Sequence, residues 1–235
     1  MAKKVVKKNT ASTKAIEPTN MYDRIEPILR VWAWIAIVWM VYRYFFRFSE
    51  WTDEFVFKPL VFVAPVIWYV VKKEKRRLES IGLTLNNFYT SLYIGLGFGF
   101  VFALEGLAAN VMKYGKIQIR PIGAFDQNGM VGLLVLSLAT ALTEEILNRG
   151  FIFSRLYEKI KNLPVSALLS AVLFVGLHVP ILVTALQLQG VTLVLFFVTT
   201  FILGLVNALL YANTGSLVAP ILVHIFWNMT VALYL

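Results

Sequence analysis

The sequence contains no cysteine, and this absence removes several kinds of chemistry at once. Disulfide bonds, thiolate metal sites and a cysteine nucleophile are all excluded. Charge is also scarce: Asp, Glu, Lys and Arg make up 15% of the 235 residues, against about 25% in a typical soluble domain. Hydrophobic residues make up 59% of the chain, and its mean hydropathy is +0.72. We therefore expect a polytopic membrane protein that folds as one domain.

Long apolar segments account for most of the chain, and each is a candidate membrane span. A hydrocarbon core about 30 Å thick requires roughly 20 helical residues. The candidate spans occupy about residues 27–46, 55–71, 87–112, 129–156, 164–186, 190–212 and 216–235. They predict an all-α bundle of about seven to eight transmembrane helices with a polar cavity inside the membrane. Residues 78–90 form a polar connector, which we expect to join the first two spans to the rest.

The first 26 residues are basic and polar, and we interpret them as a cytosolic tail rather than a cleaved signal peptide. Residues 27–235 are then a single transmembrane domain. Lysine and arginine set the orientation, because cytosolic loops are enriched in these residues. Five of them lie between Lys72 and Arg77, after the second span, whereas acidic residues follow the first span. This pattern predicts a cytosolic N-terminus. The exception is segment 113–128, which should lie outside yet contains basic residues.

The net charge of +9 might by itself suggest nucleic-acid binding. However, the basic residues gather beside the apolar segments, as expected for residues that set topology, so we expect no nucleic-acid partner. They suit the anionic cytosolic leaflet instead, which makes membrane lipids the expected partners. The sequence leaves the oligomeric state open.

Two acidic residues interrupt the fourth apolar segment, where ionisable side chains are costly and usually functional. Glu144 and Glu145 are neighbours, so on a helix they differ by about 100° and point to different faces. Glu145 lies four residues before Arg149, a spacing at which helical side chains form ion pairs. This predicts an internal Glu145–Arg149 pair and leaves Glu144 unpaired as a general base. Alternatively, both acids cap a solvated helix end, but the apolar residues on either side argue against it.

Three more polar residues lie in later apolar segments. His178 follows Phe174 by four residues, so the two could pack together on one helical face. A lone histidine in such a setting is more often structural than catalytic. His224 and Asn228 are also four residues apart, and both can donate hydrogen bonds. They could hold an oxyanion, or they could simply join helices. At the expected depths, these groups and the acid pair would meet in one cavity below the membrane surface.

The chain resembles the CAAX-protease and bacteriocin-processing family of intramembrane proteases, which includes the Rce1-type prenyl-protein endopeptidases and the Abi proteins. Three motifs carry the resemblance, in the family's order: Glu144-Glu145-x-x-x-Arg149, Phe174-x-x-x-His178 and His224-x-x-x-Asn228. The resemblance covers about residues 130–230, and the first 85 residues show none. Asn148 departs from the pattern, since the family commonly has an aromatic residue there. It falls on the face of Glu144 and could alter the pocket.

The resemblance implies a multi-helix membrane protease in which a glutamate and the first histidine activate water. Carried over, Glu144 is the general base, His178 assists it, and His224 and Asn228 stabilise the tetrahedral intermediate as an oxyanion hole. The residues that would support this site are Glu145, Arg149, Phe174 and Asn148. The substrate would be a peptide or a lipidated peptide, prenylated or not, and no cofactor is expected.

Other chemistries compete with this interpretation. Glu144, His178 and His224 could instead bind a catalytic zinc ion, but the chain lacks the His-Glu-x-x-His helix that usually places such ligands, so a metal-independent enzyme is favoured. Ser170 and Ser216 lack the sequence context of a serine nucleophile.

Two other classes of function also remain. A non-proteolytic membrane partner, such as an immunity or scaffold protein, could bind a peptide or lipid in the same cavity. A transporter is disfavoured by the lack of an inverted repeat.

Overall fold

The computed structural model describes residues 20–118, 123–182, 184 and 187–234, and this part of the chain contains helices and no strand. Six helices are long and apolar enough to cross a membrane: Met21–Phe45, Glu50–Lys73, Phe88–Met112, Asn128–Ile160, Leu163–Ile181 and Leu193–Thr214. A shorter apolar helix spans Val218–Ala232. Each of the seven predicted segments overlaps one of these helices. The chain is an all-α, multi-pass integral membrane protein, as predicted.

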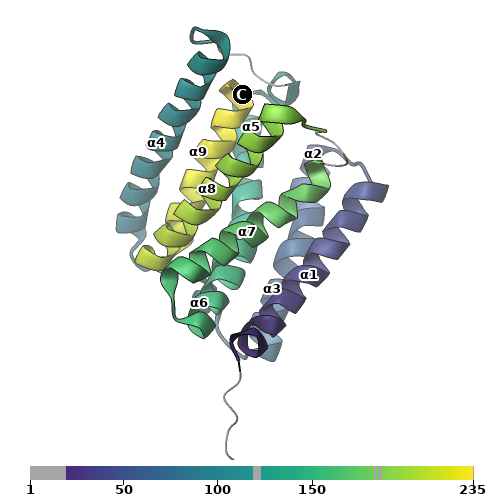
Figure 1. Cartoon of the computed structure of the whole chain (residues 1–235), viewed down its shortest axis with the longest axis vertical. Helices are drawn as coiled ribbons and strands as arrows, with labels where there is room; N and C mark the ends of the chain where they lie inside the picture. The colour runs from purple at the N-terminus through teal and green to yellow at the C-terminus, as the bar shows by residue number, and fades with distance from the viewer. Residues whose placement is uncertain (1–19, 119–122, 183, 185–186, 235) are drawn as a thin grey trace, which may run out of the picture.

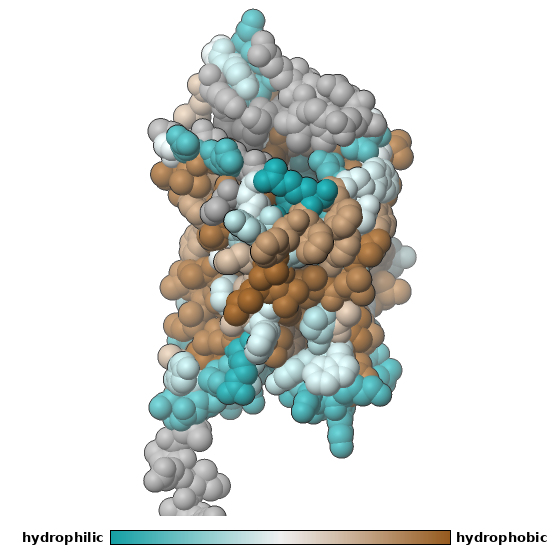
Figure 2. All heavy atoms as spheres, turned by 90° about the vertical axis from the view of Figure 1, so that its right-hand side faces the viewer, coloured by the Kyte–Doolittle hydropathy of each residue, from teal (hydrophilic) through white to brown (hydrophobic). Residues whose placement is uncertain are grey.

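The apolar surface supports this assignment. Figure 2 shows a broad band of hydrophobic residues around the middle of the visible face, with hydrophilic residues gathered at both ends. Large side chains such as Trp34, Leu60 and Val131 are more than half exposed. In water such a band would promote aggregation, but in a bilayer it faces lipid tails.

The first helix, α1 (Met21–Phe45), starts earlier than the predicted residue 27. The Asn20 side chain caps it by accepting a hydrogen bond from the Asp23 amide at 2.9 Å, which satisfies one of the free amides of the first turn. Most of the predicted basic tail, residues 1–19, lies outside the described residues. Segment 113–128, whose basic residues are the exception to the predicted orientation, is also described only in part.

The second span alternates between α-helix and wider π-helix. In chain order it contains α2 (Glu50–Thr52), η1 (Asp53–Phe57), η2 (Pro59–Val63), α3 (Ala64–Trp68) and η3 (Tyr69–Lys73). Two prolines explain part of this irregularity. Pro59 and Pro65 each lack an amide hydrogen and crowd the carbonyl one turn earlier, so the regular α-helical hydrogen bonds cannot form there.

The fourth span is the longest, and it changes geometry immediately after the acid pair. It contains α5 (Gly123–Glu145), which is kinked at the non-helical Gly129, and continues through the π-helix η5 (Ile146–Phe153) and α6 (Ser154–Ile160). All eight residues of η5 are buried. Wide π turns are rare and often occur at functional sites.

The remaining spans are α4 (Phe88–Tyr114), α7 (Leu163–Ile181), α8 (Gly190–Thr214) and α9 (Val218–Tyr234). Figure 1 places α4 at one edge of the bundle and α1 with α3 at the other. The fourth span contacts α9, α7 and the second span. Helix α7 ends at Ile181, Leu182 and Thr184 are π-helical, and the predicted end of this span at residue 186 lies outside the described residues.

Glycines bring some of these helices close together. On α4, a side-chain carbon at Gly99 would lie 2.3 Å from Phe226 of α9, and one at Gly106 would lie 1.8 Å from Thr230. Small residues at such contacts are typical of membrane helices, whose association depends on close packing.

The segment 78–90 packs on the core and is more than a polar connector. It contains the short 3-10 helix η4 (Leu78–Ile81), in which Ile81 is fully buried. A side-chain carbon at Gly150 of η5 would lie 2.7 Å from the Ile81 carbonyl oxygen, so only glycine fits there without movement. The Gly82 carbonyl accepts a hydrogen bond from the Leu217 amide at 3.1 Å. This segment therefore positions η5 and the start of α9.

Candidate active site

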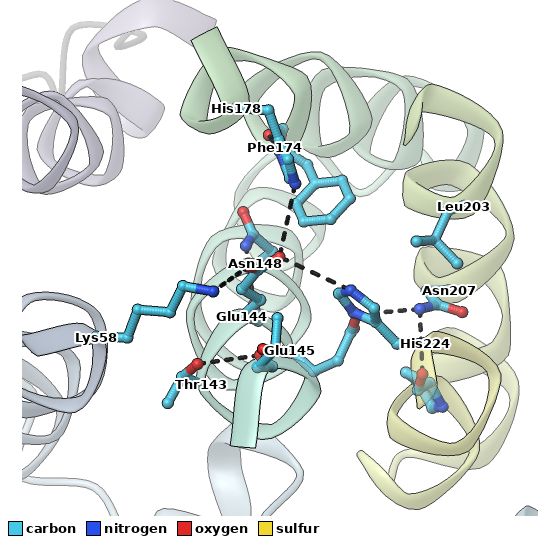
Figure 3. Close-up of polar contacts among 12 residues, drawn as sticks. Lys58, Thr143, Glu144, Glu145, Asn148, Phe174, His178, Leu203, Asn207 and His224 are labelled. Atoms are coloured by element: carbon cyan, nitrogen blue, oxygen red, sulfur yellow. Dashed lines mark hydrogen bonds and ion pairs between the residues drawn. The ribbon is translucent and has the colours of Figure 1, made fainter. Parts of the chain in front are cut away.

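The acid pair lies at the junction of α5 and η5, in the interior of the bundle. Glu145, Asn148 and Arg149 are fully buried, and Glu144 is 7% exposed. Figure 3 shows the side chains of Lys58, His178 and His224 directed toward this pair from three other helices. The site therefore depends on contacts between helices that lie far apart in the chain.

Glu145 is the centre of a hydrogen-bond cluster. Its Oε1 atom accepts from Arg149 Nη1 at 3.0 Å, which confirms the predicted ion pair. The same oxygen lies 2.7 Å from His224 Nδ1 and accepts from Asn207 Nδ2 at 3.0 Å. Asn207 also donates to the Pro220 carbonyl at 3.2 Å. Glu145 thus holds the fourth span, α8 and α9 together.

Asn207 was missed by the sequence analysis. The signal was present, because Asn207 lies within an apolar segment, where amide side chains commonly join helices through hydrogen bonds.

The prediction that Glu144 has no ionic partner is wrong. Its Oε1 atom accepts a hydrogen bond from Lys58 Nζ at 3.0 Å. The same ammonium group lies 2.7 Å from Glu54 Oε1. Lys58 belongs to the second span and is 86 residues away from Glu144, so spacing along one helix could not reveal the contact. A buried lysine within an apolar segment was nevertheless a visible signal.

The second oxygen of Glu144 faces two histidines. Oε2 lies 3.8 Å from His178 Nε2 and 3.8 Å from His224 Nε2. Both distances are too long for a direct hydrogen bond, and this buried oxygen has no hydrogen-bond partner in the part of the chain that the structure describes. A water molecule admitted to one side of these atoms, rather than between them, can hydrogen-bond to both.

The other ring nitrogens determine which atom carries the proton. His178 Nδ1 lies 2.9 Å from the Phe174 carbonyl oxygen, which can only accept, so Nδ1 carries the hydrogen. His224 Nδ1 is positioned in the same way to donate to the Glu145 carboxylate. In their neutral forms, both rings therefore present an Nε2 lone pair toward Glu144.

Phe174 forms the wall that these groups share. Its ring lies edge-on to His178, with centroids 4.7 Å apart, as the four-residue spacing indicated. It also lies edge-on to the His224 ring, with centroids 6.0 Å apart. The Arg149 guanidinium stacks 4.3 Å from the Phe174 centroid, close enough for a favourable cation–π interaction.

Asn148 supports the backbone rather than the carboxylate. Its amide donates to the main-chain carbonyl of Glu144 at 2.8 Å. The Asn148 side-chain oxygen is buried and has no hydrogen-bond partner among the described residues. Asn148 lies on the same side of the helix as Glu144, as predicted, and both residues line the cavity described next.

A cavity of about 50 Å³ lies beside Glu144. It is lined by four polar residues and by a larger apolar set: Lys58, Glu144, Asn148 and His178, with Trp39, Phe62, Phe174, Leu177 and Ile181. A space of this size holds water but no peptide chain.

Asn228 is the one predicted catalytic residue that forms no hydrogen bond or ion pair with the others among the described residues. It is half-buried on α9, one turn after His224, and forms no hydrogen bond within the described parts of the chain. Its role in an oxyanion hole stays a prediction.

Metal binding was the main chemical alternative. Among the described residues, no group of three or more histidine, aspartate or glutamate side chains is arranged to hold a metal ion. Lys58 also occupies one oxygen of Glu144, the carboxylate that this alternative requires.

Comparison with known proteins agrees with the motif analysis. Residues 126–230 match a family model described as "Type II CAAX prenyl endopeptidase Rce1-like". No curated protein and no solved structure matches the chain. The matched segment contains the acid pair and both histidines, whereas Lys58 and Glu54 lie outside it. The resemblance seen in the three motifs is confirmed.

Proposed function

We propose that this chain hydrolyses a peptide bond within the membrane by activating water. Its residues 126–230 match the Rce1-like family of type II CAAX prenyl endopeptidases. The arrangement that carries the proposal is Oε2 of Glu144, which faces the Nε2 atoms of His178 and His224 at 3.8 Å each. A water molecule admitted beside these atoms can donate one hydrogen to the carboxylate and the other to a histidine.

In the proposed first step, the water oxygen forms a bond with the carbonyl carbon of the substrate. The proton leaves water for Glu144 Oε2, with His178 orienting the water through Nε2. The carbonyl electron pair moves onto oxygen and gives a tetrahedral intermediate. When the intermediate collapses, the carbon–nitrogen bond breaks and the proton held by Glu144 passes to the leaving amine.

His224 and Asn228 are proposed to stabilise the oxyanion of this intermediate. Because His224 Nδ1 is engaged by Glu145, Nε2 can donate to an oxyanion only when the ring carries both protons. The Glu145 carboxylate at 2.7 Å would balance the charge of that ring. The Asn228 amide would supply the second donor.

The function is tested with the full chain in liposomes and a panel of peptides with prenylated and unprenylated C-terminal tails. We expect cleavage of at least one tail at a single bond, located by mass spectrometry, with the same rate in the presence of a chelator. Loss of activity with the chelator and its return with zinc would instead establish a metal-dependent enzyme. Binding of a peptide without any cleavage would favour the non-proteolytic alternative.

The absence of cysteine allows a direct test of the proposed orientation, in which the N-terminus is cytosolic. Arg77 follows the second span and its side chain is 88% exposed, whereas the exposed Glu50 is the first residue of that span. We expect Arg77→Cys to react with a membrane-impermeant thiol reagent only from the cytosolic side and Glu50→Cys only from the other side. The unmodified chain is the blank, and the reverse labelling would invert the assignment.

A further inference from the structure

We propose that Lys58, which lies outside the family segment, is a positioning residue that holds one oxygen of Glu144 so that only the other faces the two histidines. The inference rests on the proposed function, because it concerns the base of that reaction. It adds to the site a part of the chain that the three motifs do not include.

The geometry of Lys58 supports this role. The residue lies between η1 and η2 and is 8% exposed. Its ammonium group is 3.0 Å from Glu144 Oε1, and it lines the same cavity as His178. Figure 3 shows Lys58 approaching Glu144 from the opposite side to His224.

A fixed oxygen matters because the two oxygens of a carboxylate are chemically equivalent. The terminal torsion of a glutamate side chain has a broad, two-fold preference, so rotation would exchange the two oxygens. A charge-assisted hydrogen bond from Lys58 to Oε1 removes this freedom. Oε2 is then the oxygen that faces both Nε2 atoms, with no competing hydrogen bond among the described residues.

Glu54 balances the charge of Lys58 in this arrangement. A lone ammonium group beside a general base would cancel the negative charge that attracts the proton. Glu54 lies one helical turn before Lys58 and 2.7 Å from its ammonium group, so the three groups together keep one net negative charge. Glu54 also anchors the lysine to its own span, which keeps the ammonium group in place.

The first test compares Lys58→Met, Lys58→Arg and a matched control, Arg43→Met. Arg43 forms a partly buried ion pair with Asp53 at 2.6 Å in the same region but does not contact Glu144. We expect Lys58→Met to lower kcat per folded molecule by roughly 100-fold with little change in KM, since small displacements of a catalytic group have effects of this size. Lys58→Arg should recover part of the loss, and Arg43→Met should keep the wild-type kcat. A Lys58→Met variant that is no slower than Arg43→Met would overturn the proposal.

The second test does not depend on activity. The infrared difference between each protein and its Glu144→Gln counterpart isolates the absorption of the Glu144 carboxyl group. We expect the band of an ionised carboxylate in the wild-type chain and in Arg43→Met. In Lys58→Met we expect the band of a neutral acid, because a buried carboxylate that loses its cation takes up a proton. An ionised band in all three proteins would overturn the pairing, whereas these expected bands without cleavage of any peptide would overturn the proposed function alone.

Discussion

Glu144→Gln is expected to slow peptide cleavage by roughly 10²- to 10⁴-fold, the usual contribution of a general base. Glutamine has almost the same shape as glutamate, and its amide oxygen can still accept the hydrogen bond from Lys58. It cannot accept a proton from water. The variant should fold, because Glu54 remains as the counter-charge of Lys58 at 2.7 Å.

The measurement is kcat and KM in liposomes, together with peptide binding and thermal stability. Glu158→Gln is the matched control, since Glu158 lies on α6 with its side chain 40% exposed and pairs with Arg76 away from the cavity. A catalytic base predicts that Glu144→Gln loses cleavage but still binds peptide. Cleavage at the wild-type rate would place the base elsewhere, and loss of binding as well would indicate a damaged site.

Arg149→Met is expected to have the largest effect on stability, with a loss of about 3–5 kcal/mol in the free energy of unfolding. The side chains of Arg149 and Glu145 are both fully buried, so removing the guanidinium leaves a carboxylate without its cation in a region that water does not reach. The stacking on Phe174 is lost as well. His224 and Asn207 remain bound to Glu145 but do not replace the charge of a guanidinium.

The control for this variant is Arg30→Met. Arg30 forms the same kind of pair, with Glu26 four residues earlier, but its side chain is 68% exposed. Exposed pairs contribute about 1 kcal/mol or less, so this variant should be almost as stable as the wild type. Unfolding of both variants in the same detergent gives the comparison. Equal losses would mean that the burial of the Glu145–Arg149 pair has no energetic consequence.

Interactions within one helix could be predicted from the sequence. The four-residue spacing was enough for the Glu145–Arg149 pair and for the packing of His178 on Phe174, since helical geometry alone brings such residues together. The spans could also be predicted, because their length and hydropathy follow from the thickness of the bilayer. Their ends were less accurate, as the start of α1 at Met21 rather than at residue 27 shows.

Interactions between helices could not be predicted in this way. No spacing along the chain indicates that Lys58 meets Glu144 or that Asn207 meets Glu145, because these contacts depend on how the helices pack. The assumption that Glu144 is unpaired failed for this reason. The π-helical geometry of η5 was also missed, since the apolar residues on both sides of the acid pair give no sign of a wider turn.

The order of charged residues along the chain also bears on how the protein enters the membrane. An ionised group at the centre of an inserting helix costs about 2.5–3.5 kcal/mol. Glu54 with Lys58, and Glu145 with Arg149, form pairs within a single helix, so each helix carries its own counter-ion into the bilayer. Glu144 has no partner within its helix, but Lys58 precedes it in the chain. If spans insert in the order of their synthesis, the cation is already in the membrane when the Glu144 carboxylate arrives.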